Sequence, residues 1–314
     1  MVPLVSVVPV VLMLVACGGN NEEGSGLSGT ITADGSSTVG PLTAAASELF
    51  NEDNPDVRIS VGESGTGGGF EKFCAGETDM NDASRPIDDA EEAPKCKANG
   101  VEYQEMIVAN DALTVIVPTS NDWARCLTTE QLKKIWEPKA EETVTNWSQV
   151  DPAFPDVPLD LYGPGTDSGT FDYFTDEING EEGASRADFT PSEDDNIIVE
   201  GVAGSEGGLG YLGFTYYEQN TDKLKAVEID SGDGCVAPST DTVQGGTYTP
   251  LGRPLFIYPS VASVSDNEAL AAFVEFYVEN DATIAEAAQY IPLSDDQKST
   301  LESELADLQS AAGL

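Results

Sequence analysis

Histidine is absent from this chain of 314 residues. Its absence excludes the Ser–His and Cys–His catalytic pairs and removes both the usual general base near neutral pH and the commonest zinc ligand. Basic residues are scarce too: 14 Lys and Arg stand against 56 Asp and Glu, which gives a formal net charge of −42. Nucleic acid is excluded as a partner because its binding needs a basic patch. We expect no metal and no cofactor.

The acidity does not exclude a small anionic ligand. Repulsion from a charged surface is screened beyond about 10 Å at 0.1 M salt, whereas backbone N–H groups and hydroxyls act at contact distance. We interpret the acidity as a property of the surface, suited to a salty habitat. The length and the 40% content of hydrophobic residues are sufficient for two domains with real cores.

The N-terminal stretch has the features of an export signal. Residues 1–16 carry no charge and are rich in Val, Leu, Ala and Pro. The run is shorter than the about 20 residues of a membrane span and suits a signal peptide, although it lacks the usual leading Lys or Arg. The small residues before Cys17 resemble a bacterial lipobox, which predicts lipid modification of Cys17 and a flexible tether over residues 17–28. A buried strand with an incidental cysteine is the alternative.

The remaining cysteines are Cys74, Cys96, Cys126 and Cys235. An even number of cysteines beyond an export signal predicts disulfides, and four cysteines allow three pairings. Proximity in sequence favours Cys74–Cys96 and Cys126–Cys235. Their spacing is not that of a zinc site.

Three stretches share one pattern, in which a strand-like run leads through a turn of small and hydroxyl-bearing residues into a helix-like pattern. They are residues 33–42, 64–70 and 166–170. The first N–H groups of a helix lack partners within it, and its N-terminus carries about half a positive charge, which suits an anion. Each turn alone could be an ordinary cap or loop. Together they predict one oxyanion held between helix ends.

Strand and helix patterns alternate along the chain, which indicates an α/β fold. Residues 103–109 and 113–118 predict two strands separated by Asn110-Asp111, and residues 224–229 predict another strand. Residues 109–113 and 252–258 can cross between lobes. We therefore predict lobe 1 from residues 29–110 plus 254–314 and lobe 2 from residues 111–253, with two mixed sheets flanked by helices and a two-strand hinge.

One arginine is a candidate ligand for the oxyanion. The chain has five arginines: Arg58, Arg85, Arg125, Arg186 and Arg253. Arg85 alone lies in a Ser-Arg-Pro turn at the end of a predicted strand, where a guanidinium could form a fork with an oxyanion. The alternative is a salt bridge to a nearby carboxylate, and both could hold at once.

The sequence resembles the phosphate-binding lipoproteins of bacterial ABC phosphate importers over essentially the whole of residues 28–292. The similarity rests on six motifs: Asp34-Gly35-Ser36-Ser37-Thr38-Val39, Gly65-Thr66-Gly67-Gly68-Gly69-Phe70, Ala83-Ser84-Arg85-Pro86, Thr166-Asp167-Ser168-Gly169-Thr170-Phe171, Gly207-Gly208-Leu209-Gly210-Tyr211 and Arg253-Pro254-Leu255-Phe256-Ile257-Tyr258. This resemblance implies a two-lobed, type II-like periplasmic-binding fold. Such a fold closes on one dehydrated phosphate and delivers it to a membrane permease.

The resemblance also implies phosphate ligands in both lobes: Ser37, Thr38, Thr66, Gly67, Ser84, Ser168, Gly169 and Thr170. Ser84 lies where some members have an aspartate that accepts the phosphate proton. Those members also have an arginine before the Ser-Gly-Thr motif, where this chain has Pro164 and Gly165. We therefore predict that Arg85 supplies the cation and that Asp167 orients it or accepts the proton.

Proton acceptance matters for selectivity, because fully ionised sulfate offers no proton to a buried carboxylate. Asp79, Asp82 and Asp167 are candidates that the sequence does not separate. Sulfate or another tetrahedral oxyanion is therefore the main rival ligand.

An envelope phosphohydrolase or esterase using Ser64 or Ser168 is a remote alternative, since no histidine can act as its base. We expect a monomer outside the cytoplasm that contacts an ABC permease and touches the membrane only through its lipid.

Overall fold

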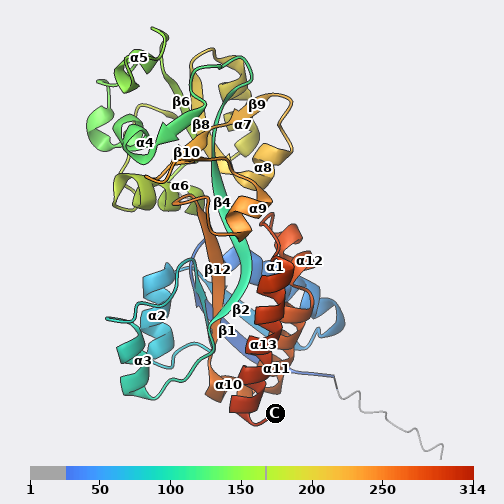
Figure 1. The fold of residues 1–314 in the computed structure, drawn as a ribbon. Coiled ribbons are helices and arrows are strands. Elements are labelled where there is room, and N and C mark those ends of the chain that lie inside the picture. Colours follow the sequence, from blue (N-terminus) through green and yellow to red (C-terminus); the bar gives the residue numbers. More distant parts are fainter. Residues whose placement is uncertain (1–25, 167) are drawn as a thin grey trace, which may run out of the picture.

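The computed structural model describes residues 26–166 and 168–314. Two lobes lie along one long axis and are joined by two long strands (Figure 1). Within those residues, no helix is both long and apolar enough to cross a bilayer. The predicted signal peptide, the lipidation site Cys17 and the start of the tether lie outside the described residues.

We keep the names lobe 1 and lobe 2 for the two sets of residues proposed from the sequence. Lobe 1 contains β1 (Gly29–Gly35), α1 (Gly40–Asp53), β2 (Val57–Gly62), α2 (Thr66–Cys74), β3 (Met80–Ala83), α3 (Ala93–Asn99), α10 (Val261–Asp266), α11 (Glu268–Glu279), α12 (Asp281–Ala287) and α13 (Asp295–Ala312). The connecting strands are β4 (Met106–Pro118) and β12 (Gly252–Pro259).

Lobe 2 is built from shorter elements. These are β5 (Cys126–Thr128), α4 (Thr129–Trp136), η1 (Pro138–Ala140), α5 (Trp147–Val150), β6 (Asp160–Gly163), α6 (Gly169–Phe174), the π-helical turn η2 (Thr175–Asn179), β7 (Thr190–Pro191), α7 (Asp195–Gly204), β8 (Gly208–Gly213), α8 (Phe214–Glu218), β9 (Leu224–Ala226), β10 (Glu228–Asp230), β11 (Cys235–Val236) and α9 (Thr240–Gln244).

Several helices begin where their capping residues predict. Thr128 before α4 and Ser294 before α13 each form a capping box, with Gln131 and Gln297 as the reciprocal partners. These side chains satisfy N–H groups that have no acceptor within the helix. By contrast, no side chain caps α1 or α2, whose starts follow two of the predicted anion turns.

The sheets of the two lobes are continuous through the connecting strands. The strand order β2-β1-β3-β12-β4-β8-β6-β7, with β9 paired to β4, makes one nine-stranded mixed sheet, and β11-β10-β5 forms a small second sheet. The predicted α/β, two-lobed fold is confirmed, with the two large sheets joined edge to edge at β12 and β4. Asn110-Asp111 does not interrupt β4, because both residues pair with β12.

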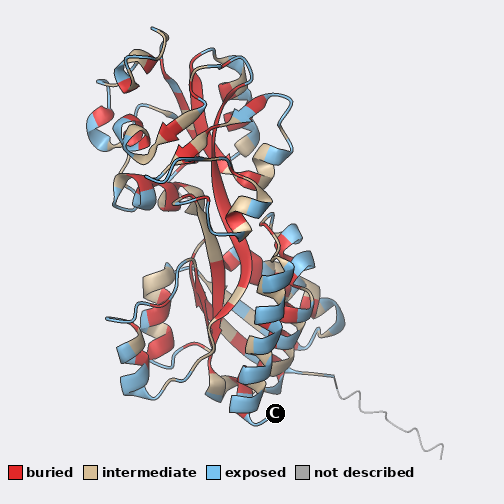
Figure 2. Ribbon diagram, viewed as in Figure 1, coloured by how far each residue is buried: buried red, intermediate tan, exposed pale blue. Residues whose placement is uncertain are grey.

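Each lobe has its own core. In lobe 1, helices α1 and α11 pack Phe50, Phe273 and Tyr277 against the sheet, and in lobe 2 the core includes Trp136 and Trp147. Figure 2 shows buried residues along the sheet and exposed residues on the outer sides of the helices. The apolar surface is therefore covered within each lobe, and the lobes meet through the connecting strands and a polar cleft.

Both disulfides favoured by sequence proximity are present, which confirms that pairing. Cys74–Cys96 joins α2 to α3, and Cys126–Cys235 joins β5 to β11. Each bond lies within one lobe. Neither therefore restrains the movement of one lobe relative to the other.

Candidate oxyanion-binding cleft

Described residues from each of the three predicted anion turns line the cleft between the lobes. The starts of α1 and α2 come from lobe 1, and the start of α6 comes from lobe 2. A Cβ atom added at Gly169, the first residue of α6, would lie 3.1 Å from Thr38 Oγ1 and 3.2 Å from Ser37 Oγ. The two lobes therefore approach each other closely at this point, and a side chain at position 169 would crowd these hydroxyls.

This contact divides the cleft into two chambers that share Ser37, Thr38 and Gly169. We call them the β12-side chamber, of about 360 Å³ and lined by Arg253, and the β4-side chamber, of about 250 Å³ and lined by residues 110–112. The predicted site residues Ser37, Thr38, Thr66, Gly67, Ser84, Arg85, Ser168, Gly169 and Thr170 all line one chamber or both. The tenth, Asp167, lies outside the described residues.

The two lobe 1 turns are held together by hydrogen bonds. Thr66 Oγ1 lies 3.1 Å from Ser84 Oγ and accepts the Ser84 N–H at 3.2 Å. Asp34 at the end of β1 accepts hydrogen bonds from the Ser64 N–H at 3.0 Å and from its hydroxyl, and it pairs with Lys72. Burial raises the pKa of Asp34, but the bonds from Lys72 and Ser64 outweigh it and lower the pKa.

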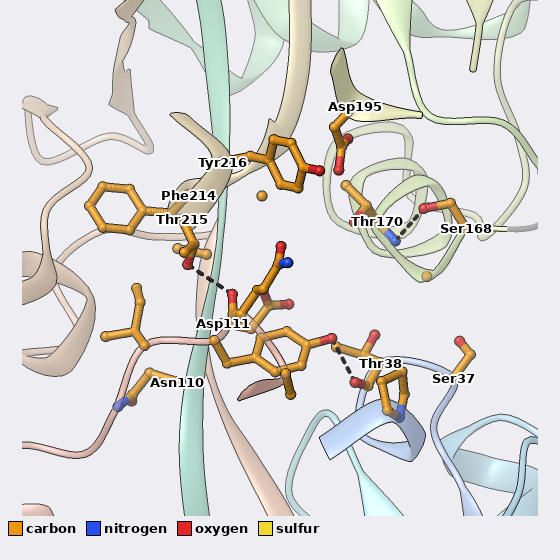
Figure 3. Close-up of a pocket in the computed structure, with 18 residues that line it drawn as sticks. Ser37, Thr38, Asn110, Asp111, Ser168, Thr170, Asp195, Phe214, Thr215 and Tyr216 are labelled. Carbon is orange, nitrogen blue, oxygen red and sulfur yellow. Dashed lines mark hydrogen bonds between the residues drawn. The ribbon is translucent and has the colours of Figure 1, made fainter. Parts of the chain in front are cut away.

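Two backbone N–H groups of the predicted phosphate ligands, those of Thr38 and Thr170, already donate to serine hydroxyls within the same turns. Ser36 Oγ accepts the Thr38 N–H at 3.2 Å, and Ser168 Oγ accepts the Thr170 N–H at 3.2 Å. Both distances are at the long end of the normal range for N–H···O bonds. In Figure 3, Ser37 and Thr38 lie across the cleft from Ser168 and Thr170. An oxyanion between them can therefore compete for these N–H groups.

The guanidinium of Arg85 lines the β12-side chamber but is already paired. It donates to both carboxylate oxygens of Glu92 at 2.8 Å, and its side chain remains 46% exposed. Burial raises the pKa of Glu92, and the bonds from Arg85 and from the Asp88 N–H outweigh it and lower the pKa. The salt-bridge alternative therefore holds for Arg85 in this structure, and its contact with the oxyanion stays a prediction.

Arg253, which the sequence analysis did not select, lies at the centre of the cleft. It enters from β12 and donates from Nη2 to Thr38 Oγ1 at 2.9 Å. Its guanidinium carbon lies 3.4 Å from the ring centroid of Tyr173. Tyr173 is fixed in turn, because its hydroxyl donates to the Pro250 carbonyl at 2.6 Å. Arg253 is thus the cation that both lobes orient.

Asp111 on β4 is the partner of Arg253. The two residues are directly opposite in the β4–β12 pairing, and Asp111 Oδ2 accepts from Nε and Nη2 at 3.3 Å. Asp111 is 7% exposed, and its burial raises its pKa against the opposing effect of Arg253. The sequence contained a signal for this pair. The predicted crossover segments 109–113 and 252–258 carry one charge each, of opposite sign, and two such residues can pair across neighbouring strands.

Carboxylates also line the β12-side chamber. Asp172, Asp176, Glu177 and Glu182 belong to α6, η2 and the loop after them. Burial raises the pKa of Asp172, and the nearby charge of Glu182 raises it further. Burial also raises the pKa of Glu177, with a further contribution from Asp176. Because both arginines of the chamber have carboxylate partners, the chamber carries no excess positive charge. Hydroxyls and backbone N–H groups must therefore provide much of the attraction for an anion.

Two of the three candidate proton acceptors do not line either chamber. Asp79 accepts the Thr32 N–H at 2.9 Å. Asp82 is fully buried between β3 and α1, where it accepts the hydroxyl of Thr43 at 2.9 Å. Burial, opposed by the Thr43 bond and assisted by Asp34, raises the pKa of Asp82 to about 7. Asp111 is instead the buried aspartate that reaches the cleft.

Replacing Asp82 with asparagine is expected to stabilise the protein at pH 8 by about 1–2 kcal/mol. The folded-state pKa lies above the unfolded value of 3.8, so the unfolded state binds fewer protons between these values and wild-type stability falls from about pH 4 to pH 7. The gain in the free energy of unfolding is smaller than the full pKa shift of Asp82 would give, because the asparagine amide also buries a polar group. Urea unfolding at several pH values from 4 to 8 measures the free energy of unfolding of both proteins. The same pH dependence in wild type and Asp82→Asn would contradict the prediction.

Comparison with known proteins identifies relatives over almost the whole chain. Residues 20–281 match the model of the PBP superfamily domain. Protein SphX of Synechocystis is 49% identical over 92% of this chain and 85% of its own length. The phosphate-binding protein PstS of Staphylococcus saprophyticus is 41% identical over 95% of this chain and 91% of its own length.

Solved structures show the same arrangement. A possible phosphate-binding protein from Planctomyces limnophilus is 46% identical, with a TM-score of 0.86 over 90% of this chain and 99% of that chain. An ABC-type phosphate transport receptor from Vibrio cholerae is 21% identical, with a TM-score of 0.66 over 84% of this chain and 99% of that chain. The second similarity concerns the fold alone.

Proposed function

Because this chain belongs to the PBP superfamily and, within it, to the family of PstS phosphate-binding proteins, we propose that it binds inorganic phosphate and delivers it to an ABC permease. The observation that carries the proposal is that the turn before α1, the starts of α2 and α6, and Arg253 all line one chamber, beside the contact between Gly169 and Thr38. Phosphate would lie at this contact, with the lobes parting slightly to admit it.

The proposed ligands come from both lobes. Lobe 1 provides Ser37, Thr38, Thr66, Gly67 and Ser84, and lobe 2 provides Ser168, Gly169, Thr170 and Arg253. Arg253 takes the role that the sequence analysis gave to Arg85, because Arg253 already contacts the Thr38 hydroxyl. Charge-assisted hydrogen bonds from a guanidinium are about twice as strong as neutral ones, so Arg253 would contribute most among the side chains.

We assign the phosphate proton to Asp111, with Asp167 as the second candidate. A raised pKa makes Asp111 a better proton-sharing partner for phosphate than an ordinary carboxylate. Sulfate has no proton to share at neutral pH, so it would leave a buried acceptor unpaired. This difference supports phosphate over sulfate as the ligand.

Titration calorimetry with phosphate, alone and with millimolar sulfate, tests the function. We expect one phosphate to bind per chain with a micromolar or lower Kd, which corresponds to a binding free energy of about −8 kcal/mol or more negative. Sulfate should compete little. The Asp111→Asn variant should lose part of this discrimination. Equal competition by the two anions would instead favour a general binding protein for tetrahedral oxyanions.

The enzymatic alternative has little support. The hydroxyl of Ser64 donates to Asp34, and that of Ser168 caps the N-terminus of α6. The relatives are described as binding proteins rather than enzymes. Asp34 is a poor general base for Ser64, because the bonds from Lys72 and Ser64 outweigh the effect of burial and lower its pKa.

We further propose that the protein acts outside the cytoplasm as a lipid-anchored monomer. Two disulfides suit an oxidising compartment. The lipobox-like sequence before Cys17 supports the anchor. Detergent partitioning of the full chain tests the anchor: Cys17→Ser should move the protein into the aqueous phase, and an unchanged distribution would argue against lipidation.

A further inference from the structure

Three successive residues after α12 connect three different parts of the molecule. The helix ends in a Schellman motif, in which the Tyr290 N–H donates to the Ala285 carbonyl at 2.8 Å and the Gln289 N–H to the Glu286 carbonyl at 3.1 Å. Gln289 has the left-handed backbone that this motif requires, with φ of 63°. Glycine is usual at this position because it has no Cβ atom. Glutamine adopts the same backbone conformation at a cost in free energy, and the motif then sets the direction of the Gln289 carbonyl.

The Gln289 carbonyl faces lobe 2. It accepts the hydroxyl of Thr215 at 2.8 Å, and Thr215 lies in the short helix α8 that follows β8 (Figure 3). Gln289 belongs to lobe 1, so this hydrogen bond crosses the boundary between the lobes.

The next two residues lead to the anion turn and to the hinge. The hydroxyl of Tyr290 donates to the Thr38 carbonyl at 2.7 Å. Burial raises the pKa of Tyr290, so the phenol keeps its proton and remains a donor. Ile291 exchanges two backbone hydrogen bonds of 2.9 Å with Asn110 of β4. One rigid segment therefore contacts lobe 2, the Thr38 turn and the hinge strand.

We propose that Gln289–Ile291 is a latch that is made when the lobes close, with Thr215 as its lobe 2 partner and Tyr290 as a positioning residue for the Thr38 turn. The latch rests on the proposed function, because closure is assumed to trap phosphate. A contact present only in the closed state adds to the stability of that state, and it therefore slows ligand release. Through Tyr290, the same segment holds Thr38 where its hydroxyl meets Arg253.

Stopped-flow measurement of phosphate binding and release tests the latch. Thr215→Val removes the hydroxyl and nearly keeps the shape, and it should raise koff about fivefold to tenfold, as expected for one lost hydrogen bond, while kon stays within about twofold. Thr215→Ser should restore the wild-type rate. Gln289→Gly keeps the accepting carbonyl and should also behave as wild type. Tyr290→Phe should weaken phosphate affinity, and it should lower the melting temperature without phosphate only slightly, as expected for one lost hydrogen bond.

A second readout separates the latch from the ligand. Fluorescence energy transfer between dyes on the two lobes, without phosphate, should show a larger open fraction in Thr215→Val than in Thr215→Ser. Equal koff values and equal open fractions for these two variants would overturn the latch, even if phosphate binds normally. A wild-type protein that binds no phosphate would refute the proposed function, and the comparison of open fractions would still decide on the latch.

Discussion

Replacement of Arg253 with methionine is expected to lower phosphate affinity about a thousandfold, or about 4 kcal/mol. The variant loses the charge-assisted hydrogen bonds to the anion and the bond to Thr38 Oγ1 that spans the lobes. It also leaves Asp111 buried without its cation, so the cleft becomes more repulsive to phosphate. Isothermal titration calorimetry measures the loss directly.

Arg58→Met is the matched control, because Arg58 is an exposed arginine on β2 and does not line the cleft chambers. It should bind phosphate as wild type does. Arg85→Met should lower phosphate affinity less than Arg253→Met does, because the Arg85 guanidinium is already paired with Glu92. If Arg85→Met had the larger effect, the assignment of the cation to Arg253 would be wrong and the original prediction from the turn would be correct.

Substitution of Gly169 by valine is expected to lower phosphate affinity at least a hundredfold, about 2.7 kcal/mol. The added Cβ would stand 3.1–3.2 Å from the hydroxyls of Thr38 and Ser37, and two further methyl groups would enter the space needed by the ligand. The added atoms would therefore crowd the phosphate proposed to lie between Gly169 and Thr38. Gly169→Ala should show an intermediate loss, because only the Cβ is added.

Gly204→Val controls for the loss of a helical glycine. Gly204 is the last residue of α7, and a Cβ added there has no atom within 4 Å. This variant should keep wild-type affinity. Melting curves without phosphate should be similar for the Gly169 series, since position 169 does not require a positive φ. Normal affinity in Gly169→Val would argue that phosphate does not lie between Gly169 and Thr38.

The sequence predicted the architecture well where local signals agree with tertiary packing. Thr128 and Ser294 are local capping signals that coincide with the starts of α4 and α13, and the alternation of strand and helix patterns indicated the fold class. Two details depended on neighbours that a single sequence does not show. The polar pair Asn110-Asp111 stays inside β4 because β12 pairs with it, and residues 224–229 divide because β9 joins the large sheet and β10 the small one.

The sequence also identified most of the cleft but not its cation. Hydroxyls and glycines next to helix starts are a local signal, and the described residues of the three turns meet in the cleft. The role of Arg253 depends on a cross-strand partner, Asp111, and on an aromatic ring from α6, which are distant in sequence. Arg85 had the stronger local signal, but Glu92, seven residues later, occupies its fork.

A crystal structure of the phosphate complex tests the central claim most directly. We predict one phosphate between the start of α1 and the start of α6, with the guanidinium of Arg253 about 2.7–2.9 Å from its oxygens, the usual range for a charge-assisted bond. Asp111 should keep its contact with Arg253. Phosphate bound in one lobe only, or held by Arg85 with Arg253 turned away, would contradict the account.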